Sequence, residues 1–333
     1  MRRSALLAVA ATLALLGAKG ARAGEGAAPA APDPYNVLVE ILGSGQPPLE
    51  AYAAESFLDI NRAPPRDELL KLADGRDPRV RMTALAVLGA TRRPEYVQLY
   101  RRGLRDDDAV ARLAAAFGLA MAGDASMVTQ IRDALSSPDI VQRRTACWLL
   151  GLMGNPSAEG LLKIKLADPD AVVVLRAAEA LGRLGSDLGL EPVRRLTEHP
   201  SHPIRAMATR LLGRIGGVPD VPRLERLCES KKFLDVKFAA IGALARLGDF
   251  KRVGLLVDML DAPADEERAL AARTLGDTAY APALAALAKL LDAKDPALRM
   301  SAAAAMLKIQ SAPEPWRERG LKEEPKTAPP GGL

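Results

Sequence analysis

Histidine, cysteine and aromatic residues are all scarce in this chain of 333 residues, which contains two histidines, two cysteines and 4% aromatic residues. Two cysteines are too few for a disulfide framework, and Cys147 and Cys228 do not have the spacing of zinc ligands. The apolar residues of the chain are mainly Ala and Leu, and these two are the strongest helix formers. The composition predicts an all-helical protein.

The first 23 residues resemble an export signal. Paired arginines are followed by an apolar run from Ala5 to Ala18 and by small residues around Ala23, the order of a secretory signal peptide. The run is shorter than the roughly 20 residues of a membrane-spanning helix. We expect residues 1–23 to be cleaved and residues 24–32 to form a linker. The protein would be exported to the periplasm or the extracellular space of a bacterium, without stable membrane insertion.

The positive net charge of +5 depends largely on this predicted signal. Removing it takes away four basic residues and no acidic residue, so 46 basic residues become 42 against 41 acidic ones and the net charge falls to +1. Proteins that bind nucleic acid draw their affinity from clustered basic side chains at phosphates. A nearly neutral mature chain therefore argues against a nucleic-acid partner.

A period of 31 residues runs through most of the chain. We call its most regular apolar positions the anchor row, and one of its steps is 32 residues: Phe57, Leu88, Leu119, Leu150, Leu181, Leu212, Leu244, Leu275 and Met306. Alanine stands four residues before every anchor, one helical turn away on the same face. A second apolar row stands nineteen residues before each anchor, from Leu38 to Leu287. Each period therefore predicts two helices, and residues 33–310 hold about nine such pairs.

The junction between the two helices carries its own pattern. Eleven residues before the anchor stands an aspartate in five of the units: Asp77, Asp108, Asp139, Asp170 and Asp295. This is a helix-capping residue, and Ser201 takes its place in the sixth unit. Four residues after the cap stands a basic residue in seven units, for example Arg81 and Arg299. We expect each acid to pair with the base of its own helix.

The glycines Gly182 and Gly185 have two possible explanations, a phosphate-binding loop or part of the repeat. The glycine one residue after the anchor recurs in five units, and so does the glycine four residues after it. A binding loop is not normally repeated in this way, whereas a helix that ends in a left-handed residue favours glycine at each such end. We therefore assign both glycines to the repeat.

The repeat resembles the HEAT-repeat family. The motif is present as Asp77-Pro78, Val80-Arg81, Ala84 and Leu88-Gly89, and its short period is most similar to the bacterial branch named after phycobilisome lyases. The resemblance implies a right-handed α-solenoid whose second helices line a concave, usually protein-binding surface. Beyond the repeats, residues 311–333 hold five prolines and predict a disordered tail. Trp316 would cover the apolar flank of the last unit or leave it open.

The candidate site lies at positions two residues before and two after the anchors, which point away from the alanine face and predict columns on the concave side. Large apolar residues occupy these columns in the third and fourth units: Phe117, Met121, Trp148 and Leu152. Basic residues follow in later units: Arg183, Arg210, Arg214, Arg246 and Arg273. Such a surface would bind a peptide that carries an apolar residue followed by acidic ones. Alternatively, Phe117 and Trp148 fill a tightly curved interior and the arginines are solvated surface.

The sequence offers few groups for catalysis. His199 and His202 stand near Glu198 in a loop at the junction of the sixth unit, and a solvated turn explains them better than a metal site. Two histidines also exclude the iron hydroxylases of this repeat family. We therefore expect no catalytic residue, no metal and no cofactor, and an exported scaffold or adaptor that binds another protein or peptide. The alternative is a lyase-like protein that binds a tetrapyrrole or another small ligand in the groove.

Overall fold

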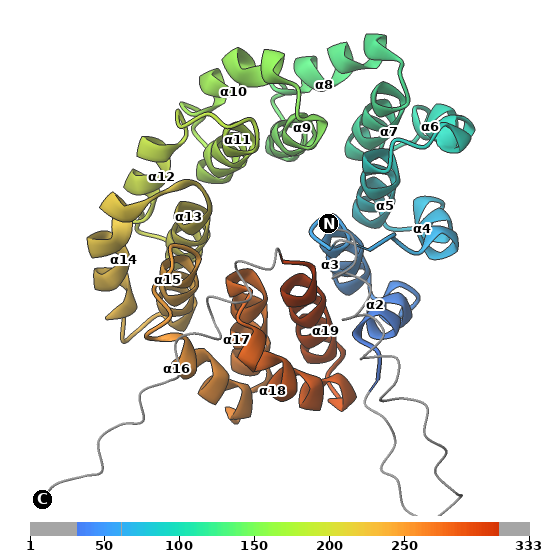
Figure 1. Ribbon diagram of the computed structural model, residues 1–333. Coiled ribbons are helices and arrows are strands. Elements are labelled where there is room, and N and C mark those ends of the chain that lie inside the picture. The colour runs from blue at the N-terminus through green and yellow to red at the C-terminus, as the bar shows by residue number, and fades with distance from the viewer. Residues whose placement is uncertain (1–31, 61, 313–333) are drawn as a thin grey trace, which may run out of the picture. The chain divides into compact units, whose positions relative to one another are not determined.

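The computed structural model describes residues 32–60 and 62–312, and within them every unit of the repeat is a pair of helices (Figure 1). The first helices form an outer layer: α2(Pro34–Leu42), α4(Arg66–Ala73), α6(Val97–Gly103), α8(Val128–Ala134), α10(Glu159–Lys165), α12(Leu190–Leu196), α14(Val221–Cys228), α16(Val253–Asp258) and α18(Leu284–Ala288). The second helices form the inner layer: α3(Pro47–Ser56), α5(Pro78–Ala90), α7(Ala109–Met121), α9(Ile140–Met153), α11(Ala171–Arg183), α13(His202–Ile215), α15(Leu234–Arg246), α17(Asp265–Thr278) and α19(Pro296–Ser311). The predicted all-α solenoid of nine helix pairs is confirmed.

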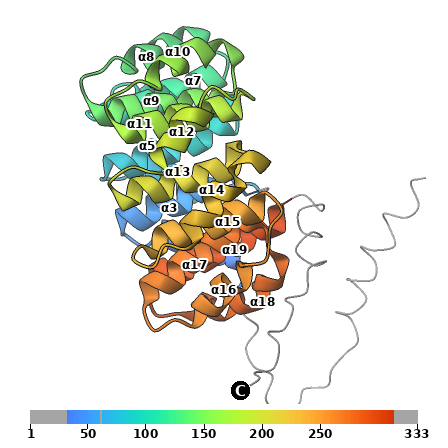
Figure 2. The same ribbon diagram turned by 90° about the vertical axis from the view of Figure 1, so that its left-hand side faces the viewer.

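The outer helices are short, and several are extended by a turn of 3-10 helix at one end. These turns are η1(Pro94–Tyr96), η2(Ala125–Met127), η3(Pro156–Ala158), η4(Val218–Asp220), η5(Met259–Asp261), η6(Ala281–Ala283) and η7(Lys289–Asp292). Turned by 90°, Figure 2 shows the helices stacked along the wall of the solenoid with their axes roughly parallel. Among the helices that the structure describes, none combines the length and the hydrophobicity of a membrane-spanning segment.

The inner helices begin where the capping pattern predicts. The Asp77 carboxylate accepts hydrogen bonds from the backbone N–H groups of Arg79 and Val80, and each of the other four aspartates of this row accepts one or two such bonds at the start of its helix. Ser201 precedes α13, but its side chain makes no capping hydrogen bond. The predicted ends are confirmed at Gly185, whose φ is +78°, whereas Gly216 is an exception with a φ of −83°.

The predicted pairing of each acid with the base of its own helix is wrong. Arg81 donates to both carboxylate oxygens of Asp106 in the next unit, each at 2.7 Å, and Arg143 pairs with Asp168 in the same manner at 2.9 and 3.1 Å. The capping carboxylate is already occupied by backbone N–H groups, so the arginine reaches across to the neighbouring unit. These bidentate pairs connect units to one another.

Consecutive inner helices pack unusually closely because the residue after the anchor is small. A Cβ atom on Gly213 would lie 2.5 Å from the Cα atom of Ala243, and one on Gly182 would lie 2.5 Å from Cγ2 of Ile215. The backbones of α13 and α15 therefore approach to a separation that only glycine permits. Because the inner helices are spaced so closely on the concave side, the solenoid curves strongly (Figure 1).

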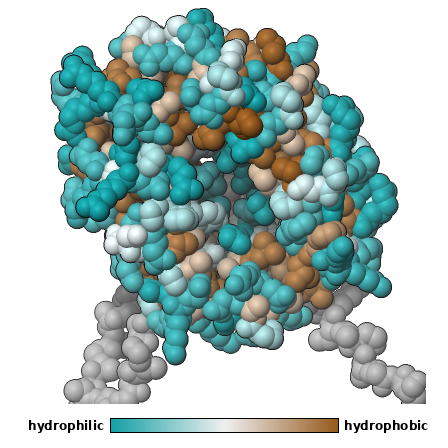
Figure 3. All heavy atoms as spheres, turned by 180° about the vertical axis from the view of Figure 1, so that it is seen from behind, coloured by the Kyte–Doolittle hydropathy of each residue, from teal (hydrophilic) through white to brown (hydrophobic). Residues whose placement is uncertain are grey.

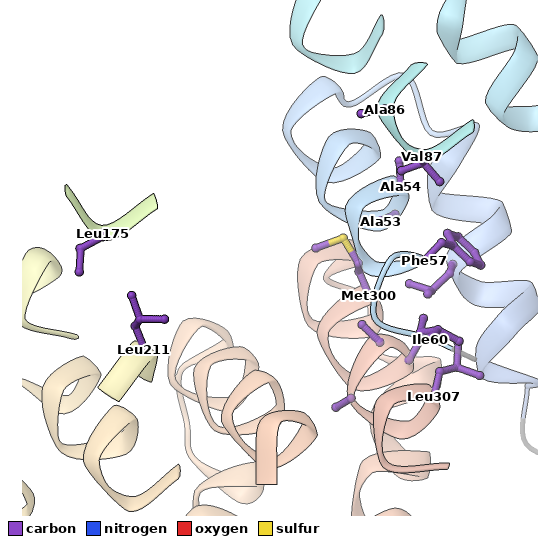
Figure 4. Packing of buried hydrophobic residues seen from close by; sticks show 14 of the residues in the cluster. Ala53, Ala54, Phe57, Ile60, Ala86, Val87, Leu175, Leu211, Met300 and Leu307 are labelled. Carbon is purple, nitrogen blue, oxygen red and sulfur yellow. The ribbon is translucent and has the colours of Figure 1, made fainter. Parts of the chain in front are cut away.

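This curvature closes the described part of the solenoid into a ring. The last helix, α19, packs against α2 and α3 at the start of the chain (Figure 1), and we call this contact the seam. Figure 4 shows Met300 and Leu307 of α19 on the side that faces Phe57 and Ile60 of the first unit. Arg299 donates to both carboxylate oxygens of Glu40, at 3.1 and 2.6 Å. The first and last units therefore cover each other.

The seam changes what is required at the two ends of the repeat. An open solenoid exposes an apolar flank at its last unit and needs a cap there, and covering by Trp316 was one of the two alternatives that the sequence left open. In the structure the first unit covers this flank. Trp316, the predicted signal at residues 1–23 and almost all of the predicted tail lie outside the described residues, and α19 continues to Ser311, one residue beyond the predicted end of the repeats.

Candidate functional site

Two cavities of about 430 and 420 Å³ lie inside the ring, lined by the inner helices. We call this enclosed space the lumen. Seen from behind, the ring surrounds a narrow opening with a largely hydrophilic interior and hydrophobic residues along part of its rim (Figure 3). Both volumes fall in the range of ligand sites, roughly 300 to 1,000 Å³.

The predicted columns do face the lumen in most units. Of the eight candidate residues, five line the cavities: Trp148, Arg183, Arg210, Arg214 and Arg246. Met121 and Leu152 are half-buried against the hydrophobic core and line neither cavity. Five of the eight predicted positions therefore lie on the concave surface, and of the other three only Phe117 is fully buried.

The predicted exposure of Phe117 is wrong. Its side chain is fully buried. A Cβ atom on Gly89 would lie 2.9 Å from the ring atoms of Phe117, so the ring fills the space that this glycine leaves between α5 and α7. Phe117 therefore belongs to the packing of the curved interior, the alternative that the sequence left open. Trp148 is half-buried and reaches the larger cavity.

A network of charged side chains spans the lumen. Asp277 on α17 lies 3.7 Å from Lys308 and 4.0 Å from Arg214. Arg214 on α13 also reaches Asp59 of the first unit at 4.0 Å and Glu179 of the fifth unit at 2.9 Å. One arginine therefore connects repeat units from opposite sides of the ring. The same network residues line both cavities, so the network lies between them.

Burial and charge act against each other in this network. Burial alone would lower the pKa of Lys308, but the carboxylates of Asp277 and Asp59 outweigh it and hold that pKa above its usual value. Burial would raise the pKa of Asp277, yet the surrounding cations hold it below its usual range. The pKa of Arg246 is lowered, by burial and by neighbouring Arg214. Arg246 is thus a cation whose charge the lumen does not fully compensate.

Basic groups outnumber acidic groups around the two cavities. Seven basic residues line them: Arg176, Arg183, Arg210, Arg214, Arg246, Arg273 and Lys308. Four acidic residues do so: Glu55, Asp59, Glu179 and Asp277. Apolar and aromatic side chains stand beside them at the larger cavity: Tyr52, Trp148, Leu175, Met207 and Leu211. The site combines an excess of positive charge with an apolar surface.

The terminal units also contribute to the site, although their residues were not among the predicted ones. Glu55 and Asp59 stand two residues before and two after the first anchor, and Lys308 stands two residues after the last. The columns therefore contained the signal. In an open solenoid these residues would lie far from Arg210 and Arg214, so only closure of the ring brings them to the site.

The side chains of Glu198, His199 and His202, which could have bound a metal, interact with other groups of the protein. The Glu198 carboxylate pairs with Arg223, His199 accepts a backbone N–H from Ser201, and His202 contacts Asp235 at 2.8 Å. Within residues 32–60 and 62–312 no group of three or more metal-ligating side chains could hold a metal ion.

The two cysteine thiols do not pair with each other. Cys147 and Cys228 are free and buried, and burial raises the pKa of the Cys147 thiol to about 12 and that of the Cys228 thiol to about 11. Both thiols stay protonated near neutral pH, and a protonated thiol is a poor nucleophile.

Comparison with known proteins identifies the repeat. A family model described as HEAT repeats matches residues 35–120 and 158–245. Among solved structures, the complex of CpcE and CpcF of phycocyanin lyase from Nostoc sp. is 18% identical and covers 75% of this chain and 96% of that chain, with a TM-score of 0.41. Human deoxyhypusine hydroxylase in complex with glycerol is 20% identical and covers 79% and 99%, with a TM-score of 0.33. No curated protein matches the sequence. At these levels of similarity, the activity of neither protein can be assigned to this chain.

Proposed function

Because this chain belongs to the HEAT-repeat family, whose second helices form a binding surface, we propose that it is an exported, non-catalytic scaffold that binds another protein. The partner would enter the lumen as an extended segment. A folded domain does not fit there, because side chains of the first and sixth units come within 4.0 Å of each other across the ring. The observation that carries the proposal is the larger cavity, where aromatic and aliphatic side chains stand beside uncompensated positive charge.

The lining of this cavity favours a protein segment over other partners. Trp148, Tyr52 and Met207 provide an apolar surface of the kind that anchors a partner's side chain, since binding energy concentrates at a few aromatic positions. The basic residues beside them suit acidic side chains that follow an apolar one. We expect neither nucleic acid nor a membrane as partner, because the excess of basic groups is confined to the enclosed lumen and no described helix could span a bilayer.

Co-purification from the native bacterium tests this function. Trp148→Ala removes an aromatic side chain that lines the larger cavity, and the purified variant should lose envelope proteins that the wild type retains. Leu255→Ala serves as the control, because Leu255 lies on the outer helix α16 with 46% of its surface exposed. The proposal is wrong if wild type, Trp148→Ala and Leu255→Ala retain the same proteins, as compared by mass spectrometry.

Two further measurements test the rest of the proposal. Export with cleavage after Ala23 predicts that N-terminal sequencing of the secreted protein begins at Gly24, whereas a protein that starts at Met1 would contradict it. The alternative from the sequence, a bound tetrapyrrole, predicts absorption of visible light by the purified protein. A colourless protein that retains a partner favours the scaffold.

A further inference from the structure

The arginines of this protein differ in how fully their guanidinium groups are used. At the junction between the second and third units, Arg81 donates hydrogen bonds to Asp106, to Asp107 and to two backbone carbonyl oxygens. Inside the lumen, Arg214 donates to Glu179 at 2.9 Å and Arg246 to the backbone oxygen of Asp277 at 2.8 Å. These side chains hold neighbouring units together.

Three arginines of the lumen are different. Arg183 and Arg210 come no closer than 3.8 Å to a carboxylate, Glu179 and Asp277 respectively, which is too far for a hydrogen bond. Arg273 makes neither a hydrogen bond nor an ion pair with any residue that the structure describes. Each guanidinium carries five N–H donors in a planar fork. The lumen therefore holds fifteen donors without an acceptor among the described residues, counting five for each of these three arginines.

All three arginines line the larger cavity, close to the apolar surface. Arg183, Arg210 and Arg273 share its wall with Trp148. They stand on α11, α13 and α17, at positions two before or two after an anchor. The side chains of Arg183 and Arg210 remain 37% and 41% exposed. A ligand can therefore reach them without breaking a hydrogen bond, although Arg183 and Arg210 each keep a longer ion pair at 3.8 Å.

We propose that Arg183, Arg210 and Arg273 form a carboxylate-binding subsite. It binds consecutive acidic side chains of the partner segment, and the apolar residue of that segment packs against Trp148. The inference rests on the proposed function and specifies its chemistry. Arginine binds a carboxylate through two parallel hydrogen bonds, and three guanidinium groups that make no hydrogen bond to the described residues can hold up to three carboxylates. Arg214 and Arg246, although predicted as binding residues, are occupied by groups of the protein and position the wall of the lumen.

Trp148 supplies a direct readout of this subsite. The chain has two tryptophans, so in a Trp316→Phe background the fluorescence comes from Trp148 alone. The probe is a blocked peptide of one leucine followed by four glutamates, titrated into the full-length chain at low salt. A peptide of one leucine followed by four glutamines has the same length without charge. We expect saturable binding of the first peptide and none of the second.

Single substitutions then locate the binding groups. Arg210→Gln and Arg273→Gln should each weaken the glutamate peptide about tenfold or more, because a hydrogen bond to a charged group contributes about 1.5 to 3 kcal/mol and about 1.4 kcal/mol corresponds to tenfold. Arg101→Gln is the matched control. Arg101 is an exposed arginine on α6 outside the lumen, and its loss changes the net charge equally. Arg210→Lys keeps the charge but lacks the fork, and should weaken binding as well.

Several results would overturn the subsite. It is wrong if the glutamate peptide does not bind, if the glutamine peptide binds equally well, or if Arg273→Gln binds as tightly as Arg101→Gln while circular dichroism shows both folded. Binding of citrate or inorganic phosphate without binding of the glutamate peptide would overturn the assignment to a protein segment.

The subsite and the proposed function fail in different ways. If the partner protein is lost in Trp148→Ala but retained in Arg273→Gln, the scaffold function stands and the subsite is wrong. If the glutamate peptide binds but no protein co-purifies, the subsite stands and the scaffold function is wrong.

Discussion

Replacing Leu307 with alanine tests whether the ring is closed. Leu307 is 3% exposed, and its burial depends on the first unit, which covers α19 at the seam. Truncating a buried leucine to alanine costs about 2 to 5 kcal/mol. In an open solenoid the same side chain would face solvent on the flank of the last unit, where substitutions usually change stability by less than about 0.5 kcal/mol. The two architectures therefore predict clearly different results.

The assay is urea denaturation of the purified chain, followed by circular dichroism. Leu275→Ala, at a fully buried anchor within the eighth unit, should lower the free energy of unfolding by about 2 to 5 kcal/mol in either architecture. Leu255→Ala, at an exposed position, should have almost no effect. We expect Leu307→Ala to resemble Leu275→Ala. If it resembles Leu255→Ala instead, the flank of α19 is solvated and the seam does not exist.

Two further predictions concern the contacts between units. Gly213→Ala should lower the free energy of unfolding by about 1 to 3 kcal/mol, because its Cβ would press on Ala243. Gly160→Ala on α10 meets no atom within 4 Å and should raise the free energy of unfolding by up to about 1 kcal/mol. A melting temperature above that of the wild type for both variants would contradict the close packing. Burial would raise the pKa of Asp168, but hydrogen bonds from Arg143 and the backbone hold it below its ordinary value of 3.8. The carboxylate therefore adds stability above that value and loses it as the pH falls through the lower, folded-state pKa. Urea midpoints measured from neutral to acidic pH should fall less steeply for Asp168→Asn, and an unchanged slope would refute this.

The periodic part of the fold could be predicted because each unit repeats the same local physics. The anchor row, the alanines and the capping aspartates recur in register, and so the number and order of the helices follow from the sequence. The columns two residues from the anchors located most of the lumen for the same reason. Phe117 was misplaced because its burial depends on a glycine in the preceding unit, Gly89, whose missing side chain leaves room for the ring.

The partners of the arginines could not be predicted in this way. A spacing of four residues between Asp77 and Arg81 satisfies the rule for a pair within one helix, but the rule does not say that backbone N–H groups already occupy the aspartate. The actual partner, Asp106, lies 25 residues away and is brought near by the stacking of units. Local patterns predict which residues are charged at a junction, whereas the packing of units decides which of them meet.

Closure itself has a sequence signal, although it is visible only with the structure in view. The residue after the anchor is glycine or alanine from the second unit to the eighth, where it faces the next inner helix at close range. In the last unit this residue is Leu307, and it is buried. A buried leucine at that position requires a neighbour beyond the end of the repeat, and in this chain α2 and α3 of the first unit are that neighbour.

Closure and the candidate site are therefore linked. Asp59 belongs to the first unit and Lys308 to the last, and they meet at 3.3 Å only because the seam brings these units together. Both then contact the network around Arg214 that divides the lumen. Opening the seam would separate Asp59 from Arg214 and Lys308, and would leave cations in the wall without their carboxylates. A change that weakens the seam, such as Leu307→Ala, should therefore alter ligand binding in the lumen although Leu307 lines neither cavity.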